Sequence, residues 1–478
     1  MKRFVAIQTL ILGLFVLLGN GIRSIGTMSL SVSQGEFASF LDISVEKTDV
    51  LVEVLLGGAV VALALAPFMI SFRTARRVAV ISAFLAAACY AAVGITMHVD
   101  PALDLREIIV IASFALGGFA VAFFAPLAQL SITMLDSNKQ RAILTTVWTA
   151  AQPIAFLIAP QMVRYVAFDI GTDNYFLMLA AMPLLFLLIV PLVFDGKERN
   201  EEAVRNAVPW RPLTIFILAV VIFEAWTTSN SLAGIGSLFS LILMASFLAI
   251  SAYILSQRQR WAPQGAALPS TAIFLLVVLF ILEIPTTGLY EGAYLVRHLC
   301  AAEVITDRAT FGAASQVAAV FLTGALLARW PALQSPLIAL SILLLLIGAV
   351  ATVFYPLQGT DVPLFYTSKI FSAAGMGMVT TVIVSSVVSS GSGNRLVMLA
   401  PAFVIMFGTE VGIEIMEMIF QTVKLLGMAE AIAYQTVFFA QVAAVLVALG
   451  LFLGQALLGV ARRAEAAAEA ARPKIVVA

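Results

Sequence analysis

Residues 123–160 read FFAPLAQLSITMLDSNKQRAILTTVWTAAQPIAFLIAP, which is an apolar helix, a short polar break and a second apolar helix. The break carries five polar or charged residues: Asp136, Ser137, Asn138, Lys139 and Arg141. These side chains must lie in water or among lipid headgroups. The same alternation of long apolar segments and short polar breaks recurs along the whole chain, so this stretch indicates the architecture of the protein.

The composition excludes an ordinary soluble domain. The chain has 478 residues, of which 62% are hydrophobic and only 11% are charged. Its apolar segments are about 20 residues long, enough to cross a hydrocarbon core about 30 Å thick. Helices pair every backbone group within the segment, whereas a membrane barrel would show alternating segments of about 10 residues. The sequence therefore predicts an all-α polytopic membrane protein.

The apolar pattern predicts fourteen membrane-spanning helices. Their ranges are 4–30, 48–70, 77–97, 107–133, 142–164, 175–194, 210–227, 231–256, 270–297, 309–328, 334–355, 363–390, 396–421 and 431–460. The first follows Lys2 and Arg3, is long and lacks a clear small-residue cleavage site, so we interpret it as a retained span.

The most polar internal stretch, residues 195–208, predicts the division of the chain. It reads DGKERNEEAVRNAV and lies between the sixth and seventh predicted spans. We expect four parts: a six-helix half at 1–194, a link with two central helices at 195–269, a second six-helix half at 270–460, and a cytoplasmic tail at 461–478. The alanine-rich start of the tail is expected to continue the last helix.

Lysine and arginine predict the orientation. With the N-terminus in the cytoplasm, most basic loop residues lie on the inner side, where such residues are favoured. The outer side then holds only six of them: Lys47, Arg106, Arg164, Arg297, Arg308 and Lys424. This places both termini in the cytoplasm of a bacterial-type cell with the protein in its inner membrane.

The sequence gives no sign of several other function classes. The formal net charge is zero, which suggests no nucleic-acid partner. No spacing of His, Cys or carboxylate residues suggests a metal site, and no phosphate-binding loop or nucleophile–base pair occurs. We therefore expect no cofactor and no catalysis. Cys89 is placed within a span and Cys300 at an outer helix end, so a disulfide between them is not expected, and His98 and His298 fall at outer helix ends.

Four stretches, in order along the chain, carry a family resemblance. They are PFMISFRTARR at 67–77, FALGG at 114–118, KQRA at 139–142 and QPIAFLIAP at 152–160. With fourteen predicted spans, this order resembles the major facilitator superfamily, in its fourteen-helix branch that includes drug/proton antiporters. The resemblance covers nearly the whole chain and implies six helices, two extra central helices and six more, with each half built from inverted three-helix repeats.

The local motifs depart from the family pattern in places. The arginines of the loop between the second and third helices are kept as the gating residues Arg73, Arg76 and Arg77. Pro67 and Ser71 stand where that motif has glycine and aspartate. Phe114 replaces the arginine of the fourth helix, and only Pro160 remains of a glycine–proline pair in the fifth. Efflux therefore does not follow from the resemblance alone.

Arg23 and Glu53 are the membrane-embedded charges of the first two spans. A charge near the centre of a span costs at least about 2.5 kcal/mol, so such residues pair or line a water cavity. Both are about 8–10 Å from the outer end of their spans at 1.5 Å per residue. We expect these two residues to pair, or Arg23 to contact the substrate or take part in coupling.

The ninth span carries the sequence EIPTTGLYEGAY at 283–294, with Glu283, Tyr290, Glu291 and Tyr294. Pro285 lacks a backbone donor and should kink this helix next to Glu283. By resemblance this is the cavity-lining first helix of the second half. Glu283 and Glu291 are therefore candidates for proton coupling or substrate contact, the alternative being structural ion pairs.

The twelfth span carries Tyr366 and Lys369, at a cavity-lining position by resemblance. Arg23 and Lys369 come from opposite halves at similar depth. Two facing cations would suit an anionic or zwitterionic substrate, with aromatic neighbours around its apolar part. The alternative is that a protein carboxylate neutralises each cation.

Glu410 and Glu414 lie four residues apart in the thirteenth span and share a helix face. Gly408 and Gly412 beside them should allow close helix packing. We expect Glu410 to partner Lys369, and Glu224, in the extra central pair, to lie peripherally near the outer interface.

Together these features predict a secondary transporter that works by alternating access, exports small amphipathic compounds and is coupled to protons. An alternative is transport of an organic anion or siderophore, including uptake. A membrane receptor or enzyme without transport is the third reading. The expected partners are a small-molecule substrate, protons and the lipid bilayer, and a monomer is favoured.

Overall fold

The computed structural model describes residues 2–43, 48–70, 74–133, 135, 137–194, 210–233, 237–261, 270–286, 291, 294–295, 302–355, 362–390 and 395–470. Every regular element in these ranges is a helix. The prediction of an all-α fold is confirmed for the described part of the chain.

The first part of the bundle contains the helices up to residue 193. They are α1 (Lys2–Val32), α2 (Gln34–Leu41), α3 (Asp49–Met69), α4 (Ala75–Val99), α5 (Leu103–Ala122), α6 (Phe124–Thr133), α7 (Asn138–Met162), the π-helical turn η2 (Val163–Ala167), α8 (Phe168–Ile170), α9 (Thr172–Leu187) and α10 (Val190–Val193).

The remaining helices follow from residue 210. They are α11 (Trp210–Ala233), α12 (Leu238–Trp261), α13 (Ser270–Glu283), the 3-10 turn η3 (Ile284–Thr286), α15 (Ala302–Arg329), the 3-10 turn η4 (Pro331–Leu333), α16 (Gln334–Val353), α18 (Val362–Ser390), α19 (Arg395–Leu425) and α20 (Glu430–Ala470). The long α20 continues past the apolar region, as the alanine-rich start of the tail predicts.

Ten helices of the described chain are long and apolar enough to cross a membrane. Three shorter apolar segments, Thr214–Asn230, Leu238–Ile254 and Thr271–Glu283, lie in α11, α12 and α13. The α19 helix, which has 31 residues, is not among the ten, and it carries three glutamates: Glu410, Glu414 and Glu417. A helix lies within each of the fourteen predicted ranges, but the count of fourteen spans stays a prediction.

The polar break between the two apolar helices of residues 123–160 is a helix boundary in the structure. The α6 helix ends at Thr133 and α7 begins at Asn138. The Ser137 side chain caps α7 by accepting the Gln140 N–H at 3.5 Å. Arg141 Nε donates to the Leu135 carbonyl at 2.6 Å, which closes the turn. The predicted helix–break–helix pattern is therefore confirmed.

The fourth predicted span, 107–133, is two helices rather than one. The α5 helix ends at Ala122, and α6 begins at Phe124. Pro126 explains the break, because it lacks the N–H that would bond Ala122 and its ring crowds that carbonyl. Every residue from Phe124 to Ile132 is buried, so this bend lies inside the bundle.

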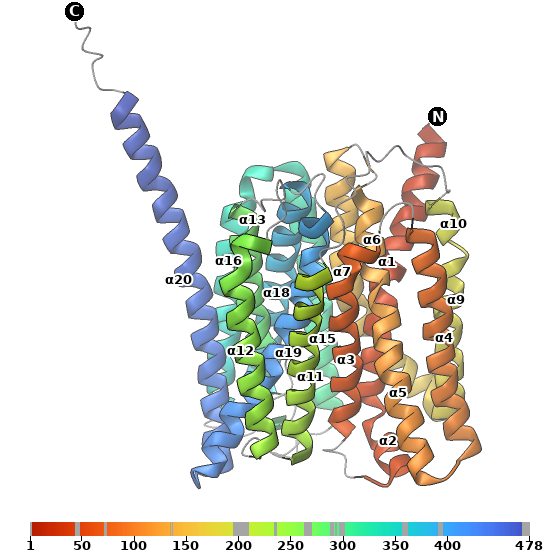
Figure 1. Cartoon of the computed structure of the whole chain (residues 1–478). Coiled ribbons are helices and arrows are strands. Elements are labelled where there is room, and N and C mark those ends of the chain that lie inside the picture. The colour runs from red at the N-terminus through yellow and green to blue at the C-terminus, as the bar shows by residue number, and fades with distance from the viewer. Residues whose placement is uncertain are drawn as a thin grey trace, which may run out of the picture.

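The helices up to residue 193 and those from residue 270 on repeat the same helix pairings. The α3 helix packs on α5 and α4 packs on α9, as α15 packs on α18 and α16 on α20. Across the middle of the bundle (Figure 1), α7 packs against α15 and α18, and α3 packs against α19. One hydrogen bond crosses this boundary, between the Thr149 and Thr381 hydroxyls at 3.2 Å.

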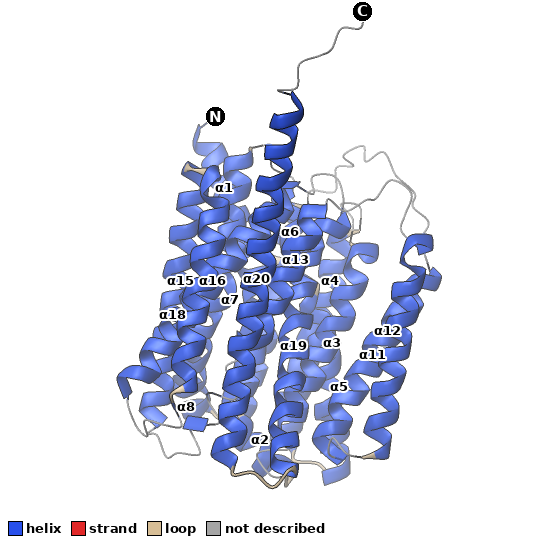
Figure 2. Ribbon diagram, turned by 90° about the vertical axis from the view of Figure 1, so that its left-hand side faces the viewer, coloured by secondary structure: helices blue, strands red, loops and turns tan. Residues whose placement is uncertain are grey.

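The α11 and α12 helices form a pair on one side of the bundle, visible in both views (Figure 1, Figure 2). They pack on each other, and α11 also packs on α3. The start of α1 and the end of α20 lie at the same end of the molecule (Figure 1). The main apolar core includes residues from both sets of helices, and a smaller core surrounds Tyr294, Tyr355 and Phe438.

Candidate functional site

The buried charges of the described chain gather in three groups. The first is Arg23 with Glu283, and the second is Glu291 with Arg308 and Lys369. The third is a set of carboxyl groups that we call the carboxyl cluster: Glu53, Glu224, Glu410 and Glu414.

Arg23 and Glu283 are two buried charges on α1 and α13 that lie close enough for one to act on the other. Arg23 of α1 is 5% exposed, and Glu283 at the end of α13 is also 5% exposed. Glu283 is the charged group that acts on Arg23. The expected pair of Arg23 with Glu53 is therefore wrong. Glu53 of α3 acts instead on Glu224 and Glu410.

The backbone around Glu283 follows the sequence prediction. The α-helix ends at Glu283, and Pro285 lies in the 3-10 turn that follows. The glycines of α19 allow it to approach closely, since a Cβ at Gly408 would lie 2.9 Å from the Glu283 Cβ. A Cβ at Gly412 would lie 2.7 Å from the Ile284 Cα. The Thr409 hydroxyl donates to Glu283 Oε2 at 3.4 Å.

Glu291, Arg308 and Lys369 form the second group, which we call the ion-pair cluster. Arg308 Nη2 donates to Glu291 Oε2, and Lys369 Nζ lies 4.0 Å from the same oxygen. Arg308 Nε also donates to the Phe365 carbonyl at 3.2 Å. Glu291 and Arg308 are 5% and 4% exposed. One carboxylate is therefore shared by two cations inside the protein.

Aromatic residues support the ion-pair cluster. The Tyr355 hydroxyl accepts a hydrogen bond from Arg308 Nη2 at 3.4 Å and bonds the Ser368 hydroxyl. The Tyr294 hydroxyl donates to the Tyr355 carbonyl at 3.2 Å. Tyr294 therefore positions the cluster through Tyr355, whereas Tyr366 packs edge-on against Phe311, with ring centres 5.5 Å apart.

Two expectations about this region are wrong. Arg308 was expected in an outer loop, but α15 begins at Ala302, before the predicted start of that span, and carries Arg308 into the bundle. Lys369 was expected to partner Glu410, but its carboxylate neighbour is Glu291. The α18 helix packs on α15, which places Lys369 beside Arg308, while the charges acting on Glu410 are other acids.

The carboxyl cluster lies where α3, α11 and α19 meet. The Glu224 and Glu410 carboxyl groups act directly on each other, and Glu53 and Glu414 act on both. Glu410 is 4% exposed, and no N–H or hydroxyl group of the described structure donates to either of its buried side-chain oxygens. Glu224 meets these acids from α11, so the expectation that it lies peripherally is wrong, while its place near the outer interface stays a prediction.

A polar chain connects this cluster to the rest of the central pair. Asn230 Nδ2 of α11 donates to Glu414 Oε2 at 3.1 Å. Ser240 of α12 donates to Asn230 Oδ1. Glu414, Asn230 and Ser240 are all buried, so α11 and α12 are fixed to α19 by polar contacts as well as by apolar packing.

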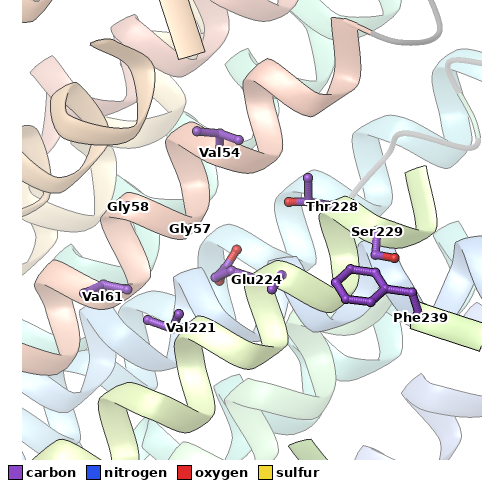
Figure 3. Close-up of a pocket in the computed structure, with 10 residues that line it drawn as sticks. Val54, Gly57, Gly58, Val61, Val221, Glu224, Thr228, Ser229 and Phe239 are labelled. Carbon is purple, nitrogen blue, oxygen red and sulfur yellow. The ribbon is translucent and has the colours of Figure 1, made fainter. Parts of the chain in front are cut away.

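A cavity of about 440 Å³ lies between α3, α11 and α12, next to the cluster. Figure 3 shows Glu224 reaching from α11 toward α3 near Gly57. A Cβ at Gly57 would collide with the Glu224 carboxylate, so the glycine makes room for it. The lining is mostly apolar: Val54, Gly57, Gly58, Val61, Val221, Glu224, Ala225, Thr228, Ser229 and Phe239.

The sequence around Glu224 itself indicates that this residue faces protein. Glu224, Thr227 and Thr228 recur at helical spacing in an otherwise apolar segment, and so mark one polar face of α11. A polar stripe on a membrane helix faces protein rather than lipid.

The other predicted residues lie apart from these groups. Arg76 and Arg77 are exposed at the start of α4, while Arg73 and Tyr290 lie outside the described residues, as do Cys300 and His298. Cys89 is buried in α4, and His98 at the end of that helix bonds Asp173 at 2.9 Å. Within the described ranges, no group of three His, Cys, Asp or Glu side chains is placed to hold a metal ion.

No protein-family model matches the sequence, and no curated protein matches it. Solved structures do match along nearly the whole chain. The proton:xylose symporter XylE of the major facilitator superfamily, bound to 6-bromo-6-deoxy-D-glucose, superposes with a TM-score of 0.64 at 15% identity, covering 92% of this chain and 95% of that one. The human organic anion transporter MFSD10 gives 0.62 at 14% identity, covering 93% and 98%.

At these identities the likeness shows the fold. The chain has the fold of major facilitator superfamily transporters, and with its ten long apolar helices it is a multi-pass membrane protein. The fourteen-helix drug/proton antiporter branch remains a prediction.

Proposed function

We propose that this chain is a secondary active transporter that works by alternating access and exports small amphipathic compounds in exchange for protons. The observation that carries the proposal is that two buried charges, Arg23 and Glu283, lie close enough for Glu283 to act on Arg23. They come from α1 and α13, the first helices of two sets of helices with the same pairings. Charges are costly in a membrane interior, and in transporters they mark substrate and ion pathways between the halves.

We further propose fourteen spans arranged as six, two and six. Residues 1–194 and 270–460 would form the two halves, 195–269 the link and central pair, and 461–478 a cytoplasmic tail. The recurring helix pairings support the division, and the common end of α1 and α20 supports placing both termini in the cytoplasm. We propose a monomer in a bacterial inner membrane, without catalytic activity.

The ion-pair cluster supports a second candidate, transport of an organic anion or siderophore in either direction. Two cations, Arg308 and Lys369, share the single carboxylate of Glu291. The Lys369 side chain keeps 25% of its surface exposed, so it can reach a solute. Arg23 does not add to this argument, because Glu283 acts on it.

Ligand identification comes first. Purified protein is heated with lipophilic drugs, siderophores and organic acids, and a ligand at 100 times its Kd stabilises the fold by about 2.7 kcal/mol. Stabilisation by amphipathic drugs supports the first candidate. Stabilisation by organic acids that is lost in Lys369→Met supports the second, with Lys424→Met on α19 as the control lysine variant.

Transport is then measured with the ligand found. Proteoliposomes with an imposed pH gradient are expected to move the solute, and collapsing the gradient is expected to stop accumulation. Binding without solute movement would contradict the proposal and favour the reading as a membrane receptor.

A further inference from the structure

The carboxyl cluster has no role in the transport function proposed above. Its members come from three helices: Glu53 from α3, Glu224 from α11, and Glu410 and Glu414 from α19. The α3 helix packs on both others, and α11 meets α19 through the Phe223–Phe407 ring contact and the Asn230–Glu414 hydrogen bond. The α11 helix belongs to the central pair, so the cluster joins that pair to both six-helix parts.

Glu410 is the member with the least compensation. It is 4% exposed, and no N–H or hydroxyl group of the described chain donates to either of its buried side-chain oxygens, which face the carboxyl group of Glu224. The charged groups that act on it are Glu224, Glu414 and Glu53, all of them acids. Glu224 also has one buried oxygen, Oε1, to which no N–H or hydroxyl group of the described chain donates.

The basic residues on the surrounding helices act on other groups or lie at helix ends, as do Arg211 at the start of α11 and Arg395 and Lys424 at the two ends of α19. Arg23 of α1 interacts with Glu283, and Lys369 of α18 lies against Glu291. On α12 the charged residues are Arg258 and Arg260, near the end of that helix. Among the described residues, no cation acts on Glu224 or Glu410.

Two carboxylates in direct contact inside an apolar bundle repel strongly, and such pairs hold a proton between them. We propose that Glu224 and Glu410 form a proton-binding site shared by the central helix pair and the second six-helix part. This inference deepens the proposed function, because it identifies the residues that carry the coupling proton. Glu283 and Glu291 each lie beside a cation, which suits a carboxylate that stays ionised.

The groove beside the site gives the proton a route. The cavity of about 440 Å³ between α3, α11 and α12 is lined by Glu224, with Thr228 and Ser229 as further polar groups (Figure 3). A water or a solute in this groove reaches Glu224 first, and Glu224 contacts Glu410 behind it.

Proton binding at this site changes how α11 and α19 fit together. With the proton present, the two carboxyl groups can lie together as they do in this structure. Without it, two like charges separate the helices, and the separation is opposed by the Asn230–Glu414 hydrogen bond. Proton occupancy therefore biases the position of α19, which is packed against α3 across the two halves.

The test is the pH dependence of thermal unfolding of the purified full chain in detergent. Because the folded site holds a proton that an unfolded carboxylate releases, stability falls as the pH rises from 6 to 9. Glu224→Gln and Glu410→Gln are each expected to remove about half or more of the loss of Tm across this range. Glu417→Gln, on the same helix as Glu410, is the matched control and keeps the wild-type loss.

Two outcomes overturn the proposal. One is a wild-type loss of Tm in both Gln variants, and the other is stabilisation by sodium. The same melts are repeated at pH 9 in sodium chloride and in choline chloride, and coincident curves are expected. A sodium-dependent rise in Tm that Glu410→Gln abolishes would replace the proton with a metal cation as the occupant.

These melts do not depend on transport. A protein that moves no solute but loses its pH dependence in both Gln variants contradicts the transporter and supports the site. A protein that transports but keeps its pH dependence in both variants supports the transporter and rejects the site.

Discussion

The ion-pair cluster and the carboxyl cluster each combine fully buried with partly exposed charges, but only the ion-pair cluster contains basic residues. In the first, the carboxylate of Glu291 faces Arg308 and Lys369. In the second, Glu410 faces only other acids among the charges that act on it. Burial alone therefore does not define a functional charge. In the ion-pair cluster the charges neutralise one another. In the carboxyl cluster no cation does so, and on our proposal bound protons take that role.

The largest effect is expected from breaking the ion-pair cluster at Arg308. Removing one partner of a buried pair leaves an uncompensated charge and costs about 3–5 kcal/mol. Arg308→Met should therefore lower the Tm and the yield of folded protein strongly, measured by thermal melts in detergent. Glu224→Gln, which removes a charge from the uncompensated cluster, is the contrasting variant and should not lower stability at pH 8. Equal losses in both variants would remove the distinction between the two clusters.

The next effect tests whether close packing of α19 positions the carboxyl cluster. Gly412 lies between Glu410 and Glu414 and meets the backbone of Ile284, which cannot move aside. Gly412→Ala should cost about 1–3 kcal/mol by overpacking, measured by the same melts. Gly450→Ala in α20 has open space around it and is the matched control. An unchanged Tm in Gly412→Ala would show that α19 is not held by this contact.

A smaller effect is expected at Lys369, the outer member of the ion-pair cluster. Its Nζ is 4.0 Å from Glu291, and Arg308 still neutralises that carboxylate when the lysine is removed. Lys369→Met should change stability by about 1 kcal/mol or less, because a partly exposed pair contributes little. A loss as large as that of Arg308→Met would mean that the two cations share the charge of Glu291 equally.

The smallest effect is expected outside both clusters, at the pair of His98 with Asp173. The His98 side chain is 70% exposed, and exposed ion pairs contribute only a few tenths of a kcal/mol. His98→Ala should leave the melting curve at pH 6 and at pH 8 almost unchanged. A clear drop confined to pH 6 would show that a surface pair contributes to the pH dependence assigned to the carboxyl cluster.

Features that depend on neighbours along the chain could be predicted from the sequence. The polar break before Asn138, the end of the α-helix at Glu283 before Pro285, and the close approach at Gly408 all follow from local chemistry. The break between α5 and α6 is also predictable in principle, because Pro126 disfavours a continuous helix, although the surrounding segment is apolar throughout.

The pairing of charges could not be predicted in the same way. Arg308 pairs with Glu291 because α15 starts several residues before the apolar pattern does, and Glu224 meets Glu410 because α11 packs where α3 and α19 join. Such pairings depend on which helix faces meet in space, and the span pattern contains no information about those faces.

The most direct test of the account is an infrared difference spectrum of the purified protein between pH 6 and pH 9, which detects protonated carboxyl groups through their carbonyl band. This band is expected to be reduced in both Glu224→Gln and Glu410→Gln and unchanged in Glu291→Gln, whose parent carboxylate is held ionised by Arg308. A band that persists in the first two variants, or that disappears in Glu291→Gln, would contradict the account.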